Sequence, residues 1–261
     1  MFPPVTPSSV GLVALVIVAA GVINGVAGFG FALIGTMALA TAVDPATAVV
    51  FMIVPILAVN LSLASELSAD QLRTCGRRFA PLLLSALVGT IVGMLLLDRL
   101  PEAPLRIGLG LISLAFVATS QRVVSIPGLD RAIDGCFVER PLAMIGVGSV
   151  SGLLFGGTNV GVQLIAYLRS CKLSHGLFVG VVALVFLGLN GVRVGVAVGF
   201  GLYPNTAVLG GSAAAAVPAV VGVAAGKRLR DRVSERRRRG VVLGLLVVVG
   251  LRLVLGGLGV V

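Results

Sequence analysis

The chain has 261 residues, of which 57% are hydrophobic and only 11% are charged, and its mean hydropathy is +1.12. These values exclude an ordinary soluble domain, and the apolar residues gather in runs as long as a bilayer is thick. The net charge of +10 would suggest a nucleic-acid partner in a soluble protein. In a membrane protein it is typical of basic cytoplasmic loops, so we expect an all-α, polytopic helical membrane protein with no nucleic-acid partner.

Apolar runs follow one another along the whole chain, at 10–43, 46–65, 79–97, 103–121, 141–168, 176–200, 205–226 and 240–261. The segment before the first run has no basic n-region, and no small-residue cleavage site follows, so we predict no removable signal peptide. The first and fifth runs are longer than one crossing needs. Each carries a Gly-rich interruption, "GVINGVAGFG" at 21–30 and "SGLLFGGTNVG" at 151–161.

The two interruptions have a functional and a packing interpretation. A glycine in a helix interior costs about 1 kcal/mol relative to alanine, so its presence there needs a reason. A helix that breaks inside the bilayer frees backbone groups, and the N–H groups at the start of a half-helix favour an anion. The alternative is close helix packing through small residues four positions apart, a spacing that Gly21 and Gly25 fit.

The sequence indicates two related halves. At an offset of 133 residues, the segment 93–114 matches 226–247, and the "GVINGVAGFG" interruption matches 148–157 at a similar offset. The matched pairs are Gly89 with Gly222, Gly93 with Gly226, Asp98 with Asp231, Arg99 with Arg232, Arg106 with Arg239, Gly21 with Gly148, Gly25 with Gly152 and, at offset 130, Asn60 with Asn190. We therefore expect a first transmembrane repeat at 1–125, a connection at 126–140 and a second repeat at 141–261.

Basic residues indicate how the halves are oriented. If runs one and five each return to the side they entered from, 16 loop Lys and Arg residues lie in the cytoplasm and 2 outside. If all runs cross, the division is 12 to 6, which fits the positive-inside rule less well. Each half then crosses three times after a broken, re-entrant helix pair, so the halves are inverted. The predicted cytoplasmic loops of this inner or plasma membrane protein are 65–78, 122–140, 169–175 and 226–240.

Few polar side chains lie within the apolar runs, and polar groups there are usually functional or packed inside the protein. Asn24 lies at the first interruption; Thr158 and Asn159 lie at the second. Asn60 and Asn190 are either interhelical hydrogen-bond partners or walls of a site. Arg193 either pairs with an anionic substrate or reaches the membrane interface, and the role of Arg252 stays open.

The remaining residues exclude several kinds of chemistry. All acidic residues lie in connections or at run ends, which disfavours a cation carrier or a carboxylate proton shuttle. His175 is the only histidine, and Cys75, Cys136 and Cys171 have no paired spacing. We expect no catalytic residues, no metal site and no cofactor. The basic tract 227–240 is expected to anchor the topology and touch anionic lipid headgroups.

The motifs "GVAGFGFALIG" (25–35) and "GLLFGGTNVG" (152–161), with the repeated Gly-x-x-x-Gly before Asp-Arg, resemble the TauE/SafE family, also called the sulfite exporter or TSUP family. The resemblance covers essentially the whole chain. It implies a bacterial, archaeal or plant membrane transporter of sulfite, sulfonates and related small organic anions. Phe31 and Ala32 stand where the family often has further glycines, so we expect them to influence substrate preference.

Together these observations predict an anion transporter, with a non-transporting assembly or scaffold subunit as the alternative and a homodimer left open. The substrate-binding residues are expected to be Asn24, Gly28, Phe29, Gly30, Asn60, Gly156, Gly157, Thr158, Asn159, Asn190 and Arg193. The glycines let a ligand approach the backbone, Asn60 and Asn190 donate hydrogen bonds, and Arg193 supplies positive charge.

Overall fold

The computed structural model of the protein describes residues 7–27, 30–64, 73, 77–97, 99–120, 141–161, 164–165, 167–168, 175–229, 232 and 234–260. Over these residues the secondary structure is helical, without strands. Five helical segments among them are long and apolar enough to cross a membrane: Pro45–Ser62, Ala80–Leu97, Pro141–Thr158, Val181–Gly199 and Thr206–Leu229. The prediction of an all-α, polytopic membrane fold is confirmed.

The first apolar run folds as two helices, α1 (Pro7–Ala27) and α2 (Phe31–Ala40). Gly30 is the N-cap of α2 and has a φ of 104°, in the left-handed region that favours glycine. Gly21 and Gly25 lie inside α1, so the run breaks after these two glycines rather than at them. Two residues expected at the site, Gly28 and Phe29, lie outside the described residues.

The second run forms α3 (Pro45–Phe51) and α4 (Ile53–Ala64), a division that the sequence analysis did not predict. The start of α3 is well defined, because the Asp44 carboxylate accepts hydrogen bonds from the backbone N–H and the hydroxyl of Thr47, each at 2.8 Å. An aspartate at this position satisfies backbone donors that would otherwise have no partner.

Pro55 accounts for the irregularity between α3 and α4. Proline has no N–H, so the carbonyl of Phe51, four residues earlier, lacks its usual helical donor. The hydroxyl of Ser212 donates to this carbonyl at 2.6 Å from another helix. A side chain distant in sequence therefore replaces the missing backbone hydrogen bond.

The fifth run begins with α9 (Pro141–Thr158). Its glycines are helical, and the helix ends at Asn159, whose φ of 61° is also left-handed. At 18 residues α9 is about 27 Å long, close to the thickness of the hydrocarbon core. Whether the first and fifth runs return to the side they entered from stays a prediction.

The other helices agree with the predicted runs to within a few residues. They are α6 (Ala80–Leu97), α7 (Glu102–Ser120), α11 (His175–Gly199), α12 (Thr206–Leu229) and α13 (Glu235–Gly257). The basic tract 227–240 thus spans the end of α12, a short connection and the start of α13.

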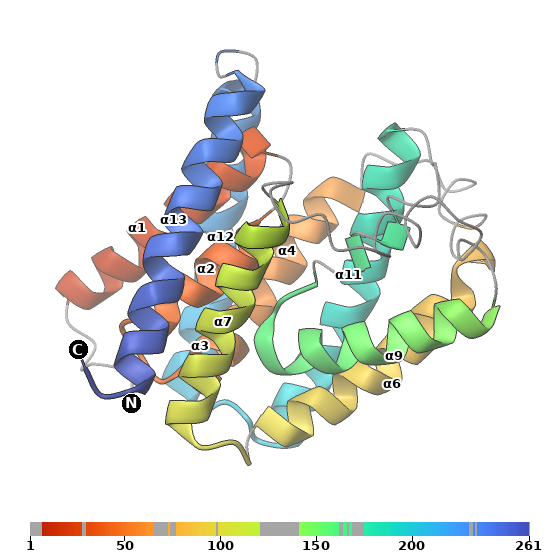
Figure 1. The fold of residues 1–261 in the computed structure, drawn as a ribbon, viewed down its shortest axis with the longest axis horizontal. Helices are drawn as coiled ribbons and strands as arrows, with labels where there is room; N and C mark the ends of the chain where they lie inside the picture. Colours follow the sequence, from red (N-terminus) through yellow and green to blue (C-terminus); the bar gives the residue numbers. More distant parts are fainter. Residues whose placement is uncertain are drawn as a thin grey trace.

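The most extensive helix contacts are reciprocal between the two halves. Helix α1 packs along α12, and α9 packs along α6, as Figure 1 shows for the second pair. The helices approach so closely that a Cβ atom at Gly25 would meet the carbonyl oxygen of Val223, and one at Gly152 would meet that of Ala86. The packing interpretation of these glycines therefore holds in both halves.

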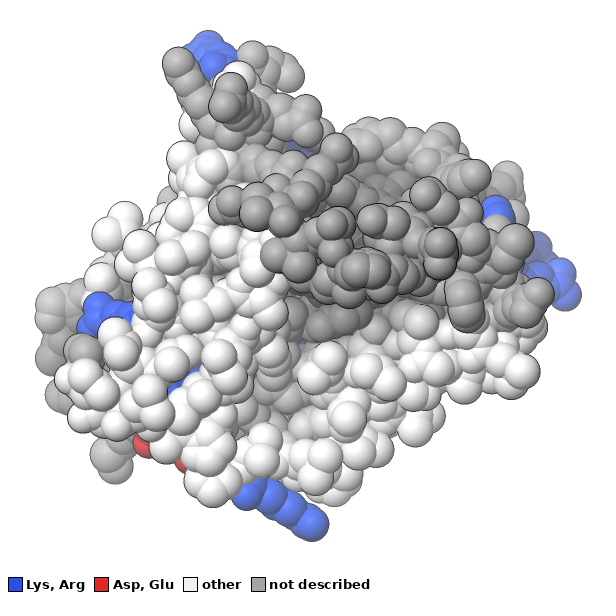
Figure 2. All heavy atoms as spheres, in the orientation of Figure 1, with Lys and Arg blue, Asp and Glu red and all other residues white. Residues whose placement is uncertain are grey.

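Two clusters of buried apolar side chains hold the helices together. One joins α1, α2, α3, α4, α7, α12 and α13 with the last turns of α6 and α11, and the other joins α6, α9 and the middle of α11. Many large apolar side chains are exposed on the outer surface, among them Leu142, Val150 and Val217. Figure 2 shows few charged side chains among the described residues of the face that it draws. Such a surface suits a lipid environment.

We expect Gly152→Ala to destabilise the protein by about 1–3 kcal/mol, because the added methyl group would collide with the backbone of α6. The matched control is Gly146→Ala on the same helix, where a Cβ atom meets nothing within 4 Å. That variant should be neutral or more stable by up to about 1 kcal/mol. Thermal unfolding of both variants in detergent tests the close contact, and equal midpoints would contradict it.

The interaction between Ser212 and the proline-freed carbonyl is testable with a double-mutant cycle. Ser212→Ala should cost about 1–3 kcal/mol, because a buried carbonyl loses its donor. In a Pro55→Ala background the backbone N–H at residue 55 is available to the Phe51 carbonyl, so the same serine change should cost less. Additive effects of the two substitutions on unfolding would show that the serine does not compensate for the proline.

Candidate functional site

Arg193 is the most unusual side chain within the helices. It lies on α11, in the membrane-spanning segment Val181–Gly199, and its relative exposure is 0%. Its guanidinium donates through Nη1 to Oδ1 of Asn190 at 3.2 Å and through Nη2 to the carbonyl of Gly156 at 3.3 Å. The guanidinium carbon also lies 4.8 Å from the centre of the Phe155 ring, within cation–π range.

The end of α9 explains why a backbone carbonyl is available to Arg193. In a continuing helix the N–H of Val160 would donate to the carbonyl of Gly156. Here it donates to the hydroxyl of Thr158 at 3.2 Å, because the chain turns at Asn159. The guanidinium therefore sits at the C-terminal end of α9, where the helix dipole is negative.

The positive charge of Arg193 is only partly compensated. Its Nε–H has no hydrogen-bond partner, and no Asp or Glu among the described residues forms an ion pair with it. The helix dipole supplies partial charges, and the Phe155 ring supplies a weak electrostatic contact. A buried cation with these neighbours attracts a further negative group.

Asn159 links the end of α9 to the first half of the protein. Its Nδ2 donates to Oγ1 of Thr36 at 2.8 Å and to the carbonyl of Val49 at 2.9 Å. Both amide hydrogens are thus used within the protein, and Oδ1 is buried without a partner. In this arrangement Asn159 joins α9 to α2 and α3.

The other asparagines also form hydrogen bonds with backbone groups. Oδ1 of Asn24 accepts the N–H of Phe31 at 3.1 Å and so satisfies the first turn of α2 across the break. Asn60 donates to the carbonyl of Ile56 at 2.9 Å, and Asn190 makes the same bond to the residue four positions before it at 2.8 Å. The two asparagines that the sequence matched therefore have the same local geometry.

The structure brings together only some of the expected site residues. Gly156, Asn190 and Arg193 meet directly, whereas Asn24 and Gly30 lie at the other break. Gly157 is buried, and a Cβ atom there would be in ordinary contact with the Gly93 carbonyl. The roles of these expected site residues as substrate contacts stay predictions.

Three side chains with notable surroundings were not predicted from the sequence. Phe155 faces the Arg193 guanidinium, Thr36 accepts from Asn159, and the hydroxyl of Tyr203 is buried without a hydrogen-bond partner. Thr36 could have been noticed as a polar residue inside an apolar run. Nothing in the local pattern marks Phe155, which lies in an apolar run, or Tyr203, which lies in a connection beside Pro204 and Asn205.

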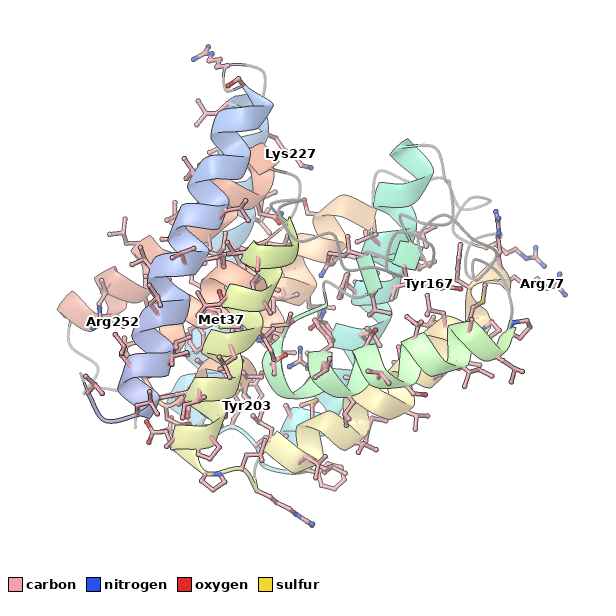
Figure 3. All side chains as sticks on the ribbon, in the orientation of Figure 1. Met37, Arg77, Tyr167, Tyr203, Lys227 and Arg252 are labelled. Carbon is pink, nitrogen blue, oxygen red and sulfur yellow. The ribbon has the colours of Figure 1, made fainter. Side chains whose placement is uncertain are left out.

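The structure also locates Arg252, whose role the sequence left open. Arg252 is exposed on α13, five residues before the helix ends, so it lies on the outer surface (Figure 3). Its long side chain is placed to reach toward the membrane interface. Within the described part of the chain, His, Cys, Asp and Glu residues form no group of three that could hold a metal ion.

Comparison with known proteins gives one match that covers nearly the whole chain. The model of the family described as sulfite exporter TauE/SafE matches residues 13–253. No curated protein and no solved structure matches the chain significantly. Because the family match extends over both broken runs and all the helices that follow them, the chain belongs to the sulfite exporter TauE/SafE family of membrane transporters.

Proposed function

We propose that this protein moves small anions across the inner or plasma membrane, with sulfite, sulfonates and related organosulfur or organic anions as the substrate class. Membership of a membrane transporter family supports transport in general. A negatively charged substrate is inferred from one observation: the guanidinium of Arg193 is fully buried, and no described carboxylate neutralises it.

The energetics of burial favour an anion over a cation as the substrate. A charge within the membrane is costly unless an opposite charge or strong hydrogen bonds accompany it. An oxyanion near Arg193 would supply both the opposite charge and an acceptor for the free Nε–H. A cation there would meet a like charge without a described carboxylate to offset it.

Inverted halves would provide the route across the membrane. The reciprocal packing of α1 on α12 and of α9 on α6 supports this arrangement. The Ser113 hydroxyl donates at 2.9 Å to the carbonyl of Leu246, and these residues are separated by 133 positions, the offset of the repeat. Equivalent positions meet in this way where a two-fold axis passes between two elements. Transporters of this design alternate access by moving one half against the other.

A transport role without catalysis is consistent with the intramembrane side chains. The polar groups around Arg193 are amides, hydroxyls and backbone carbonyls, which bind and orient a ligand without a nucleophile–base pair. The alternative is a membrane scaffold, for which Arg193 would serve only to hold α9 against α11. Direct measurement of flux separates these two roles.

Purified protein in liposomes should take up labelled sulfite or methanesulfonate. Arg193→Met should lower uptake about 30-fold or more, because the anion loses its buried charge partner. Arg193→Lys, which keeps the charge but not the planar fork, should retain part of the activity. Arg252→Met removes an exposed cation from α13 and should transport like the wild type.

The size-exclusion profile and unfolding midpoint of each variant separate a lost site from a lost fold. A well-folded Arg193→Met protein with wild-type uptake would remove Arg193 from the transport site. Wild-type protein that carries none of a panel of sulfur-containing and carboxylate anions would favour the scaffold.

The orientation is testable with the natural cysteines. Cys75, Cys136 and Cys171 all fall in connections proposed to be cytoplasmic, so a membrane-impermeant thiol reagent added to intact cells should leave the protein unlabelled. Arg99→Cys places a thiol at an exposed position between α6 and α7, which is proposed to face outward, and should be labelled. Labelling of the wild type, or protection of the added cysteine, would reverse the proposed sidedness.

A further inference from the structure

The Phe155 ring lies over one face of the Arg193 guanidinium. Both side chains are fully buried, and the guanidinium carbon lies 4.8 Å from the centre of the ring. An aromatic ring carries negative partial charge on its faces, so it attracts a cation that lies over it, and more strongly where water is excluded. Phe155 therefore acts on the charge of Arg193 as well as on its packing.

Neighbouring residues hold the Phe155 ring in this place. Phe186 and Arg193 lie seven residues apart on α11, which is two turns, so both side chains project from the same face of that helix. The Phe155 ring from α9 fits between them, with its centre 5.0 Å from that of Phe186 and the two ring planes tilted by 58°. Tilted pairs of this kind are a favourable arrangement of aromatic rings.

The glycine-rich segment at the end of α9 makes room for this arrangement. A Cβ atom at Gly161 would collide with the Phe186 ring and lie 3.3 Å from Cδ2 of Phe155. In the same segment, Gly156 provides the carbonyl that accepts from Arg193. The motif "GLLFGGTNVG" thus supplies a ring, a backbone acceptor and the space that the two rings need.

The contact between ring and guanidinium is strongest when no anion is bound. In the empty site no described carboxylate forms an ion pair with Arg193, so the ring faces an unneutralised cation. A bound anion neutralises much of that charge, and the ring attracts the resulting ion pair less. An interaction that stabilises the empty state more than the occupied state lowers the affinity for the ligand.

We propose that Phe155 is a positioning residue of the anion site, whose ring holds the Arg193 guanidinium in the empty site and lowers its affinity for the anion. The inference rests on the proposed anion transport. The ring covers one face of the planar guanidinium, and the Nε–H without a partner lies in the plane and stays available to an oxyanion. A transporter releases its substrate in every cycle, so a site that binds an anion too tightly slows turnover.

Fluorinated phenylalanines separate the charge of the ring from its shape. Incorporation of phenylalanine with one, two or three ring fluorines at Phe155 weakens the negative face in steps, while the size of the side chain changes little. In liposomes, the half-saturating concentration of sulfite and of methanesulfonate should fall along this series. The total decrease should be about 3-fold or more, because cation–π contacts between desolvated groups are strong enough to give such a change.

Phe186 provides a matched control. It belongs to the same apolar cluster and packs on Phe155, but its ring faces no cation among the described residues. The same fluorine series at Phe186 should leave the half-saturating concentration unchanged. Calorimetric titration of the detergent-solubilised proteins with methanesulfonate measures affinity without transport, and the dissociation constants should follow the same order. A ring that only fills space gives no trend in either series.

The two proposals fail in distinguishable ways. If Arg193→Met abolishes uptake while the series at Phe155 leaves half-saturation and binding unchanged, or weakens both, Phe155 does not lower the anion affinity. An equal trend at Phe186 also overturns the inference, because Phe186 does not face the cation. The anion transport proposal stands in both cases. If no protein carries or binds either anion, both proposals are overturned. The unfolding midpoint of each protein ensures that folded protein is compared.

Discussion

A helix that breaks in an apolar medium leaves backbone groups that water does not reach, and every one of them needs a partner from the protein. This constraint explains the intramembrane polar side chains better than any single functional role. Asn24 accepts an N–H at the start of α2, Ser212 and Asn159 donate to carbonyls of α3, and Arg193 donates to one at the end of α9. These four polar side chains are placed where the backbone is interrupted.

Structural support and substrate binding are therefore combined in the same residues. The Arg193 guanidinium holds Asn190 through Nη1 and the end of α9 through Nη2, and Nε is its one nitrogen without a hydrogen-bond partner. A group fixed on two sides presents its remaining donor in one direction, which reduces the entropy lost when a ligand binds. The rigidity that stabilises the break also preorganises the proposed site.

Much of the fold could be predicted from the sequence, because run length and the spacing of polar residues are local properties. The positions of the two breaks were predicted to within a few residues, and the family resemblance is confirmed. The interruption at Pro55 was missed, since an apolar run conceals it. The pairing of α1 with α12 depends on two surfaces about 200 residues apart, and periodicity does not encode such a contact. The contact of the Phe155 ring with Arg193 likewise depends on how α9 and α11 meet in three dimensions.

The pairing of α1 with α12 has a consequence for biosynthesis. The ribosome adds about 5–20 residues per second, so α1 enters the membrane on the order of 10–40 seconds before its partner exists. During that interval its glycine face is open to lipid or to the insertion machinery. The last long helices must then insert beside elements that are already in place. Assembly of this protein is completed from its C-terminal end, and a ribosome that stalls late leaves the first helix without its main contact.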